Sequence, residues 1–271
     1  EKNFHEFVDN FMFKAILARV KQGYKTGKFP LKGEPKLPDN FMGRPEIEAD
    51  AGEAAAKAAA EVCPTKAISC EEGKLCLDMG KSIFCGKCAA VCPKIKFTKD
   101  WRLAAFRRED LIIRAGDKNP FTNPGETSVQ LTPPKELVKL YKNSLKLREV
   151  SAGGCAACEL DFNVLGTLAW DMGRFGISVV ASPRHADGVL VTGPISKNMA
   201  LALEKTHAAM PEPNVTIACG SCAISGGIYA ASVETTPELM EKFKPDLYIP
   251  GCPPHPATTL DALVRLCGIL K

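Results

Sequence analysis

The stretch Asn214–Gly227, NVTIACGSCAISGG, indicates the fold of the C-terminal half of the chain. Its first part is a short apolar run over 214–219, and its second part is a glycine-rich turn that carries Cys222, as expected where a buried strand ends in a loop. Similar runs recur on both sides, and helical segments lie between them. We predict strands over 145–150, 177–181, 187–192, 214–219 and 246–250, and helices over 157–172, 196–209, 236–243 and 256–270. This alternation predicts a flavodoxin-like α/β domain, with a mostly parallel sheet covered by helices.

Cysteines follow three of these predicted strands. Cys155, Cys222 and Cys252 each come shortly after a strand, and Cys158 completes a CxxC pair with Cys155. The carboxyl ends of parallel strands form the ligand crevice of such a sheet, so we expect these thiols to meet there. Four thiolates are what a [4Fe–4S] cluster requires, and the neighbouring glycines allow close approach of the backbone. A four-cysteine zinc site is the alternative, but its pairs usually lie on short hairpins, so we favour the cluster.

Length and composition limit the class of protein. The chain has 271 residues, 45% hydrophobic and 24% charged, which is ordinary for a globular protein of about two domains. The net charge of +4 comes without a basic stripe interleaved with aromatic residues, so we expect no nucleic-acid partner. We expect no signal peptide and no membrane-spanning segment, since no apolar run approaches roughly 18 residues. Twelve cysteines in clustered units favour metal ligation in a reducing cytoplasm over secreted disulfides.

Residues 145–271 resemble a family of electron-transfer subunits. The resemblance is carried by the two cysteine turns, Ser-Cys-Ala-x-Ser-Gly-Gly and Pro-Gly-Cys-Pro-Pro, and by Arg174–Ile177 and Ser182–Asp187. The family is the small subunit of membrane-bound, energy-converting [NiFe] hydrogenases, including the formate hydrogenlyase type. The terminal-cluster subunit of respiratory complex I is similar. Complex I subunits typically have adjacent cysteines at the first element, whereas Cys155-x-x-Cys158 has the hydrogenase spacing, so we favour a hydrogenase.

The resemblance implies a site and a set of partners. Cys155, Cys158, Cys222 and Cys252 would ligate a proximal [4Fe–4S] cluster that relays electrons to or from a NiFe site on a hydrogenase-like large subunit. Further electron-transfer and membrane-arm subunits would hold the chain in the cytoplasm, peripheral to the inner membrane. Glu159 matches the family's proton-relay residue, although a carboxylate at a helix N-terminus is the simpler explanation.

Other residues of this half have less specific explanations. Arg184 and His185 resemble a basic pair that flanks the cluster, or form a loop salt bridge and a capped histidine. Cys219 and Cys267 are interpreted as buried apolar residues.

The N-terminal half resembles a degenerate two-cluster ferredoxin-like subunit. Residues 85–93, CGKCAAVCP, match the end of the bacterial ferredoxin run, and Cys63-Pro64 repeats its last part. The family spacing places the first three ligands of the other run at Glu53, Ala56 and Ala59, inside the helix-forming segment EAAAKAAAE. We therefore infer that one cluster is absent. The second would use Cys63, Cys85 and Cys88, with Ser82 as a possible oxygen ligand.

The spacing leaves the number of N-terminal clusters open. Cys70 and Cys76 are extra cysteines, and either could replace the missing thiolate. One intact cluster, none and two are all compatible with the sequence.

The expected organisation has four parts. An amphipathic helix and extended docking arm occupy 1–44. A degenerate, small α+β ferredoxin-like domain occupies 45–112, a linker with a short helix 113–144, and the cluster domain 145–271. The apolar stripe of the first helix contains Phe4, Phe7, Val8, Phe11, Met12, Ala15, Ile16 and Val20. This stripe either covers its own domain or docks on a partner or a membrane surface. Besides the hydrogenase hypothesis, a complex I-like subunit that passes electrons to quinone and a non-redox docking scaffold stay open.

Overall fold

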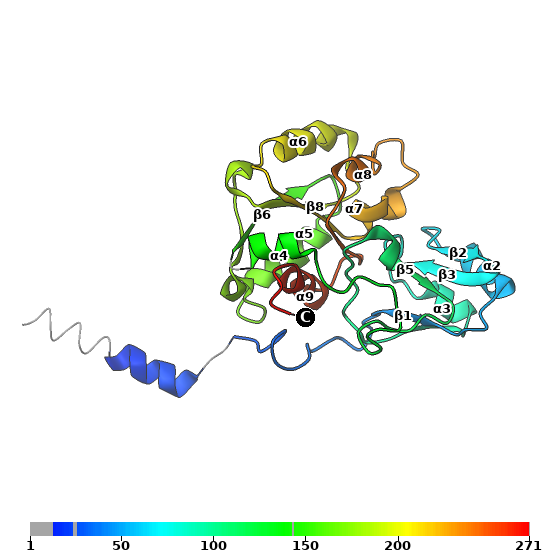
Figure 1. Ribbon diagram of the computed structural model, residues 1–271, viewed down its shortest axis with the longest axis horizontal. Coiled ribbons are helices and arrows are strands. Elements are labelled where there is room, and N and C mark those ends of the chain that lie inside the picture. Colours follow the sequence, from blue (N-terminus) through cyan, green and yellow to red (C-terminus); the bar gives the residue numbers. More distant parts are fainter. Residues whose placement is uncertain (1–12, 24–25, 143, 271) are drawn as a thin grey trace, which may run out of the picture.

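The computed structural model describes residues 13–23, 26–142 and 144–270 (Figure 1). A large α/β unit formed by the C-terminal half packs beside a small α+β unit formed by the N-terminal half. The predicted fold class is confirmed for both units.

The C-terminal unit is built on one five-stranded parallel sheet with the order β10-β9-β8-β6-β7. Counted along the chain, this is the order 2-1-3-4-5 of flavodoxin-like folds, so the topological switch point lies between β6 and β8. The central strands β8 and β9 are buried along their whole length, as expected for a sheet covered on both faces. The strands are β6 (Leu145–Ser151), β7 (Ile177–Val179), β8 (Gly188–Thr192), β9 (Val215–Cys219) and β10 (Leu247–Ile249).

Helices cover both faces of this sheet (Figure 1). On β8, Val189 and Val191 pack with α6, α7 and α8, while Leu190 packs with α5 and α9 on the opposite face. Alternate residues of one strand therefore contribute to two separate cores. The helices are α4 (Lys135–Tyr141), α5 (Ala157–Asn163), α6 (Lys197–Ala208), α7 (Ser221–Ser225), α8 (Leu239–Phe243) and α9 (Pro256–Leu266).

The helix predicted over 157–172 is shorter than expected. The α-helix α5 ends at Asn163, and the 3₁₀ turns Val164–Gly166 and Met172–Phe175 follow it. Asp171 has a left-handed backbone with φ of 45°, which a continuous helix does not allow. Apolar spacing alone predicted the longer helix, because it does not detect this change of backbone direction. Shorter 3₁₀ turns occur at Arg108–Leu111, Pro183–His185 and Gly227–Tyr229.

The N-terminal unit contains two small antiparallel sheets, β2-β3-β5 and β1-β4. The segment EAAAKAAAE forms the predicted helix α2, whose Ala56 and Ala59 are buried in the core of this unit. The elements are β1 (Pro45–Ile47), α2 (Glu53–Glu61), β2 (Ile68–Glu71), β3 (Lys74–Asp78), α3 (Lys87–Val91), β4 (Ile95–Phe97) and β5 (Ile112–Arg114).

The N-terminal arm has two parts, a helix that extends away from the body of the molecule and a later segment that packs against the body (Figure 1). A helix over residues 13–22 exposes Phe13, Ile16, Leu17 and Val20, while the predicted helical positions from Phe4 to Met12 lie outside the described residues. Further along, Phe29 is buried between Trp101 and Trp170, at ring-centroid distances of 5.7 Å to each. Arg174 donates hydrogen bonds to the carbonyl oxygens of Gly27 and Phe29. The later segment of the arm is thus fixed against both halves.

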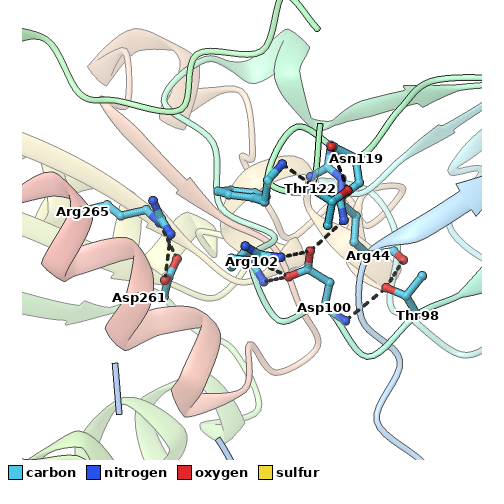
Figure 2. A network of polar contacts seen from close by, with 9 residues as sticks. Arg44, Thr98, Asp100, Arg102, Asn119, Thr122, Asp261 and Arg265 are labelled. Carbon is cyan, nitrogen blue, oxygen red and sulfur yellow. Dashed lines mark hydrogen bonds and ion pairs between the residues drawn. The ribbon is translucent and has the colours of Figure 1, made fainter. Parts of the chain in front are cut away.

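The two halves are joined by polar contacts as well as by packing. A short antiparallel bridge connects Ala105 with Tyr248 of β10. Figure 2 shows a second region, where Arg102 and Asp100 form an ion pair of 2.7 Å near the Asp261–Arg265 pair of α9. The Phe121 ring lies 4.6 Å from the guanidinium carbon of Arg102 and 5.0 Å from that of Arg265. One aromatic ring therefore contacts cations from both halves.

Candidate functional site

Four cysteines lie at the carboxyl edge of the parallel sheet. Cys155 lies in the loop after β6, and Cys158 lies in the first turn of α5, which follows that loop. Cys222 lies in α7 after β9, and Cys252 lies in the loop after β10. Cys155 and Cys252 are exposed, whereas Cys158 and Cys222 are half-buried. The parallel topology brings residues that are almost 100 positions apart in sequence to one edge.

Hydrogen bonds join the loops of Cys222 and Cys252, and Gly220 lies close to Cys158. The Ser221 N–H donates to the Gly251 carbonyl at 2.9 Å, and the Ser221 hydroxyl donates to the same oxygen at 3.0 Å. Gly220 has φ of +92°, and a Cβ atom at this position would lie 2.6 Å from Cys158 Sγ. A Cβ atom at Gly227 would lie 3.0 Å from Cys222 Sγ. The two glycines leave the thiols room that any side chain would take.

The four thiols interact electrostatically. Burial raises the pKa of Cys158 to about 12, with further contributions from Cys222, Glu159, Cys252 and Cys155. Burial, together with Cys252 and Cys155, raises the pKa of Cys222 to about 11. A positively charged metal group compensates this repulsion and stabilises thiolates, so the donor set fits an iron–sulfur cluster.

The geometry differs from that of a site for a single ion. In the described part of the chain, no group of three or more His, Cys, Asp or Glu side chains is arranged to hold one metal ion. A cubane cluster takes four separate thiolates, which need not converge on one atom.

Glu159 lies at the switch point of the sheet. Its Oε1 accepts hydrogen bonds from Ser151 Oγ at 2.5 Å and from Thr192 Oγ1 at 2.7 Å. Ser151 ends β6 and Thr192 ends β8, and the two residues are paired in the sheet, so the carboxylate bonds to the ends of two neighbouring strands. Burial raises the pKa of Glu159, but the two hydroxyl donors outweigh it and bring the pKa below its ordinary value.

A second acidic residue was missed at the sequence level. Glu149 is half-buried in the middle of β6, and its Oε1 has no hydrogen-bond partner among the described residues. Burial and the nearby Glu159 raise the pKa of Glu149 to about 7. Little in the sequence signalled it, because β6 reads LKLREVS and Glu149 is one of three charged residues in that strand.

The remaining residues singled out in this half lie as follows. Arg184 and His185 are exposed in the 3₁₀ turn after β7. Cys219 is buried at the end of β9, and Cys267 is buried directly after α9. Both cysteines pack in the same apolar core.

The N-terminal half brings its predicted ligand residues together. Cys63, Ser82, Cys85 and Cys88 line one cavity, together with Ile68, Leu77 and Phe97. The other cysteines lie elsewhere: Cys70 is exposed on β2, Cys76 is buried on β3, and Cys92 packs in the core with Ala56 and Ala59. The helix α2 thus carries Glu53, Ala56 and Ala59 at the positions where a ferredoxin run would carry cysteine.

Within the described ranges, no helix has the length and apolar character needed to cross a membrane.

Part of the chain is similar to known proteins. Residues 155–266 match the family model described as NADH ubiquinone oxidoreductase, 20 kDa subunit. An NAD(P)H-quinone oxidoreductase subunit from a Picosynechococcus species is 42% identical over 114 residues, which are 42% of this chain and 47% of that protein. An NADH-quinone oxidoreductase subunit from Desulfovibrio desulfuricans is 41% identical over 118 residues, which are 44% of this chain and 64% of that protein. The matched region thus spans about half to two thirds of each relative.

One solved structure is also similar. A chain of an archaeal respiratory membrane complex, the membrane-bound sulfane sulfur reductase, shares 30% identity over 49% of this chain and 74% of its own length. The TM-score is 0.43, so this likeness carries no argument of its own.

Proposed function

From the match of residues 155–266 to the family of NADH ubiquinone oxidoreductase 20 kDa subunits, we propose that this chain is an electron-transfer subunit of a complex I-related oxidoreductase. It holds one [4Fe–4S] cluster on Cys155, Cys158, Cys222 and Cys252. The observation that carries the proposal is the gathering of these four thiols at one sheet edge inside the matched region.

The residues of the chain have distinct roles in this proposal. The four thiolates hold the cluster, which supplies one-electron redox chemistry when bound. Ser221 fixes the loops of Cys222 and Cys252 against each other through its two hydrogen bonds to Gly251. The apolar core below the sheet edge keeps water from one side of the site, while the exposed Cys155 and Cys252 face outward, where a redox partner can approach.

Iron and acid-labile sulfide in the purified full chain test the C-terminal site. Cys155→Ala should remove about four iron atoms per chain, together with the corresponding low-temperature EPR signal of the reduced protein. The matched control is Cys219→Ala, a buried cysteine two positions before the Ser221 turn, which should keep its iron. Unchanged iron in Cys155→Ala, or zinc in place of iron, would contradict the proposal.

The nature of the partner is a finer proposal. The relatives named above are subunits of quinone oxidoreductases, which supports transfer of electrons toward quinone within a membrane-bound complex. The spacing Cys155-x-x-Cys158 instead supports a hydrogenase-like large subunit with a NiFe site. In either case the chain would lie peripheral to the membrane and be held there by partner subunits. Nickel in the co-purified large partner supports the hydrogenase, and a nickel-free partner with quinone reduction supports the quinone-linked complex.

Glu159 is the proposed proton relay of this site. Its lowered pKa keeps it ionised at neutral pH, so it can accept a proton next to the second ligand. Glu159→Gln should lower turnover of the assembled complex and leave the iron content unchanged. If Glu159→Gln keeps full turnover, Glu159 is not a proton relay and its role is to link β6 and β8 by hydrogen bonds.

A further inference from the structure

We propose that the cavity lined by Cys63, Cys85, Cys88 and Ser82 is a second iron–sulfur site with mixed ligands, three thiolates and the Ser82 oxygen, built directly against the loop of Cys222. This second site is separate from the C-terminal cluster, and the experiment below measures it independently of that cluster.

The cavity gathers four donors from two separate segments. Cys63 follows α2, whereas Ser82 and Cys85 belong to the loop that leads into α3 and Cys88 lies in the first turn of α3. Ser82 is 7% exposed and Cys88 9%, whereas Cys63 is half-buried and Cys85 is exposed. Two donors therefore face the interior of the unit, and the Cys85 side of the cavity is open to solvent. The rest of the lining is mainly apolar, with Ile68, Leu77 and Phe97 among its residues. An apolar surround of this kind is one in which clusters are held in proteins.

Backbone donors already point at two of these ligands. The Ala67 N–H donates to Cys63 Sγ at 3.2 Å, and the Phe84 N–H donates to Ser82 Oγ at 3.1 Å. Such donors stabilise negative charge on a ligand atom, which both a thiolate and a deprotonated serine oxygen carry.

The other cysteines of this half do not reach the cavity. Cys70 lies on the exposed side of β2, and Cys92 is 5% exposed within the core that contains Ala59. Among the described cysteines, only Cys63, Cys85 and Cys88 line the cavity, and the hydroxyl residues Thr65 and Ser82 line it as well. Ser82 lies in the same segment as Cys85 and its Oγ accepts the Phe84 N–H, whereas Thr65 Oγ1 lies 3.8 Å from Cys63 Sγ, so Ser82 is the fourth donor of the proposal. Iron accepts oxygen as well as sulfur ligands, so serine can complete the set.

The cavity and the C-terminal site share a wall. The Ser221 hydroxyl donates to the Ser82 carbonyl at 2.5 Å and to the Gly251 carbonyl at 3.0 Å, so one side chain contacts both ligand loops. Ser225 of α7 donates to the Gly80 carbonyl at 3.0 Å. Ile83 and Phe84, which lie between Ser82 and Cys85, line a pocket together with Cys252. A cluster bound in the N-terminal cavity would therefore lie close to the C-terminal one.

Iron content distinguishes the two sites. The full chain, purified without oxygen, should contain about eight iron atoms, and Cys85→Ala should lower this to about four. Cys70→Ala is the matched control and should keep about eight. Cys155→Ala should also keep about four iron atoms, which would be those of the N-terminal cavity. This variant therefore measures the N-terminal site without changing any residue in it. Loss of all iron in Cys155→Ala, or the same iron content in Cys85→Ala and Cys70→Ala, would overturn the proposal.

Two substitutions test the serine ligand. Ser82→Ala leaves three thiolates, so the cavity should lose about one iron atom and give the EPR signal of a three-iron cluster in the oxidised protein. Ser82→Cys should keep all the iron and raise the reduction potential of this site, because sulfur stabilises oxidised iron less than an alkoxide does. If both variants keep the iron content, EPR signal and potential of the unmodified chain, Ser82 is not a ligand.

EPR of the reduced protein tests whether the two sites lie close together. When both sites are reduced, magnetic interaction should broaden their EPR signals, and Cys155→Ala should restore a simple signal from the N-terminal site. Additive, unbroadened signals in the unmodified chain would contradict a site built against the Cys222 loop.

Discussion

Single glycines determine whether the thiols at the sheet edge have room. Gly220 combines a left-handed backbone, with φ of +92°, and a distance of 2.6 Å from its missing Cβ to Cys158 Sγ. The backbone conformation disfavours any other residue, and the contact excludes even a methyl group. The two effects can be separated, because other glycines of the chain have the conformation without the contact.

Gly220→Ala should therefore lose the C-terminal cluster as well as stability. Gly73→Ala is the control, since Gly73 has φ of +76° and nothing within 4 Å of its missing Cβ. Both variants should lose about 1 kcal/mol from backbone strain. Only Gly220→Ala should also lose iron, as measured by iron content and visible absorbance. Equal iron in the two variants would mean that the thiol adapts to the methyl group.

The buried carboxyl of Glu149 should make stability depend on pH. The folded chain keeps this proton up to a pKa of about 7, while the unfolded chain releases it near 4.5. The protonated Glu149 carboxyl therefore makes its full contribution to the free energy of unfolding below pH 4.5, and this contribution is lost as the pH rises to about 7. Glu149→Gln should remove this dependence and raise the free energy of unfolding at pH 8 by about 1–3 kcal/mol, allowing for solvent screening.

Urea denaturation of the two chains between pH 4.5 and pH 8 measures this effect. The exposed Glu126→Gln is the matched control and should leave the pH profile unchanged. Parallel profiles for Glu149→Gln and the unmodified chain would show that the carboxyl finds a partner or solvent in solution.

At the scale of elements, α2 shows how an apolar helix occupies the positions where a ferredoxin would bind metal. Alanine has the highest helix propensity, and the helix has no side-chain cap at Gly52, so packing must supply the rest of its stability. Ala56 and Ala59 provide that packing at 2% and 0% exposure. The surrounding core therefore has no free volume there.

Ala59→Leu should destabilise the N-terminal unit. Three additional carbon atoms at a fully buried position overpack the core, which typically costs about 1–3 kcal/mol. Ala58→Leu lies on the exposed face of the same helix and should change the free energy of unfolding by less than about 0.5 kcal/mol. Thermal unfolding compares the two, and equal midpoints would mean that the core around Ala59 can expand.

At the scale of the whole molecule, the joint between the halves depends on a few long-range contacts. The Phe121 ring lies between the guanidinium groups of Arg102 and Arg265, which belong to different halves. Arg44 in the same region is 4% exposed, and burial lowers its pKa to about 10 although Asp100 opposes the shift. The joint is therefore dry enough for its cation–π contacts to contribute.

Phe121→Ala should loosen this joint. Loss of two cation–π contacts and of apolar area should cost about 1–3 kcal/mol and increase protease cleavage in the loop between β5 and α4. Phe13→Ala, at a position that is 63% exposed, should leave both readouts unchanged. Cleavage rates that do not differ between the two variants would exclude a stabilising role for the Phe121 ring.

The sequence by itself determined the alternation of strands and helices in residues 145–270 and the side of the sheet on which the four C-terminal cysteines lie. Both follow from local properties, since apolar runs mark the strands and each cysteine follows a strand end. Helix propensity, which is local, also predicted α2. The set of Cys63, Ser82, Cys85 and Cys88 came from the resemblance to the ferredoxin run.

Only the tertiary structure decided what lies around these residues. The break after Asn163, the unpartnered oxygen of Glu149 and the Ser221–Ser82 hydrogen bond all depend on groups far apart in the chain. Such contacts arise when two units pack against each other, and no sequence pattern of either unit contains them. The four thiols at the sheet edge could be foreseen residue by residue, whereas their closeness to the N-terminal cavity was decided by the packing of the two halves.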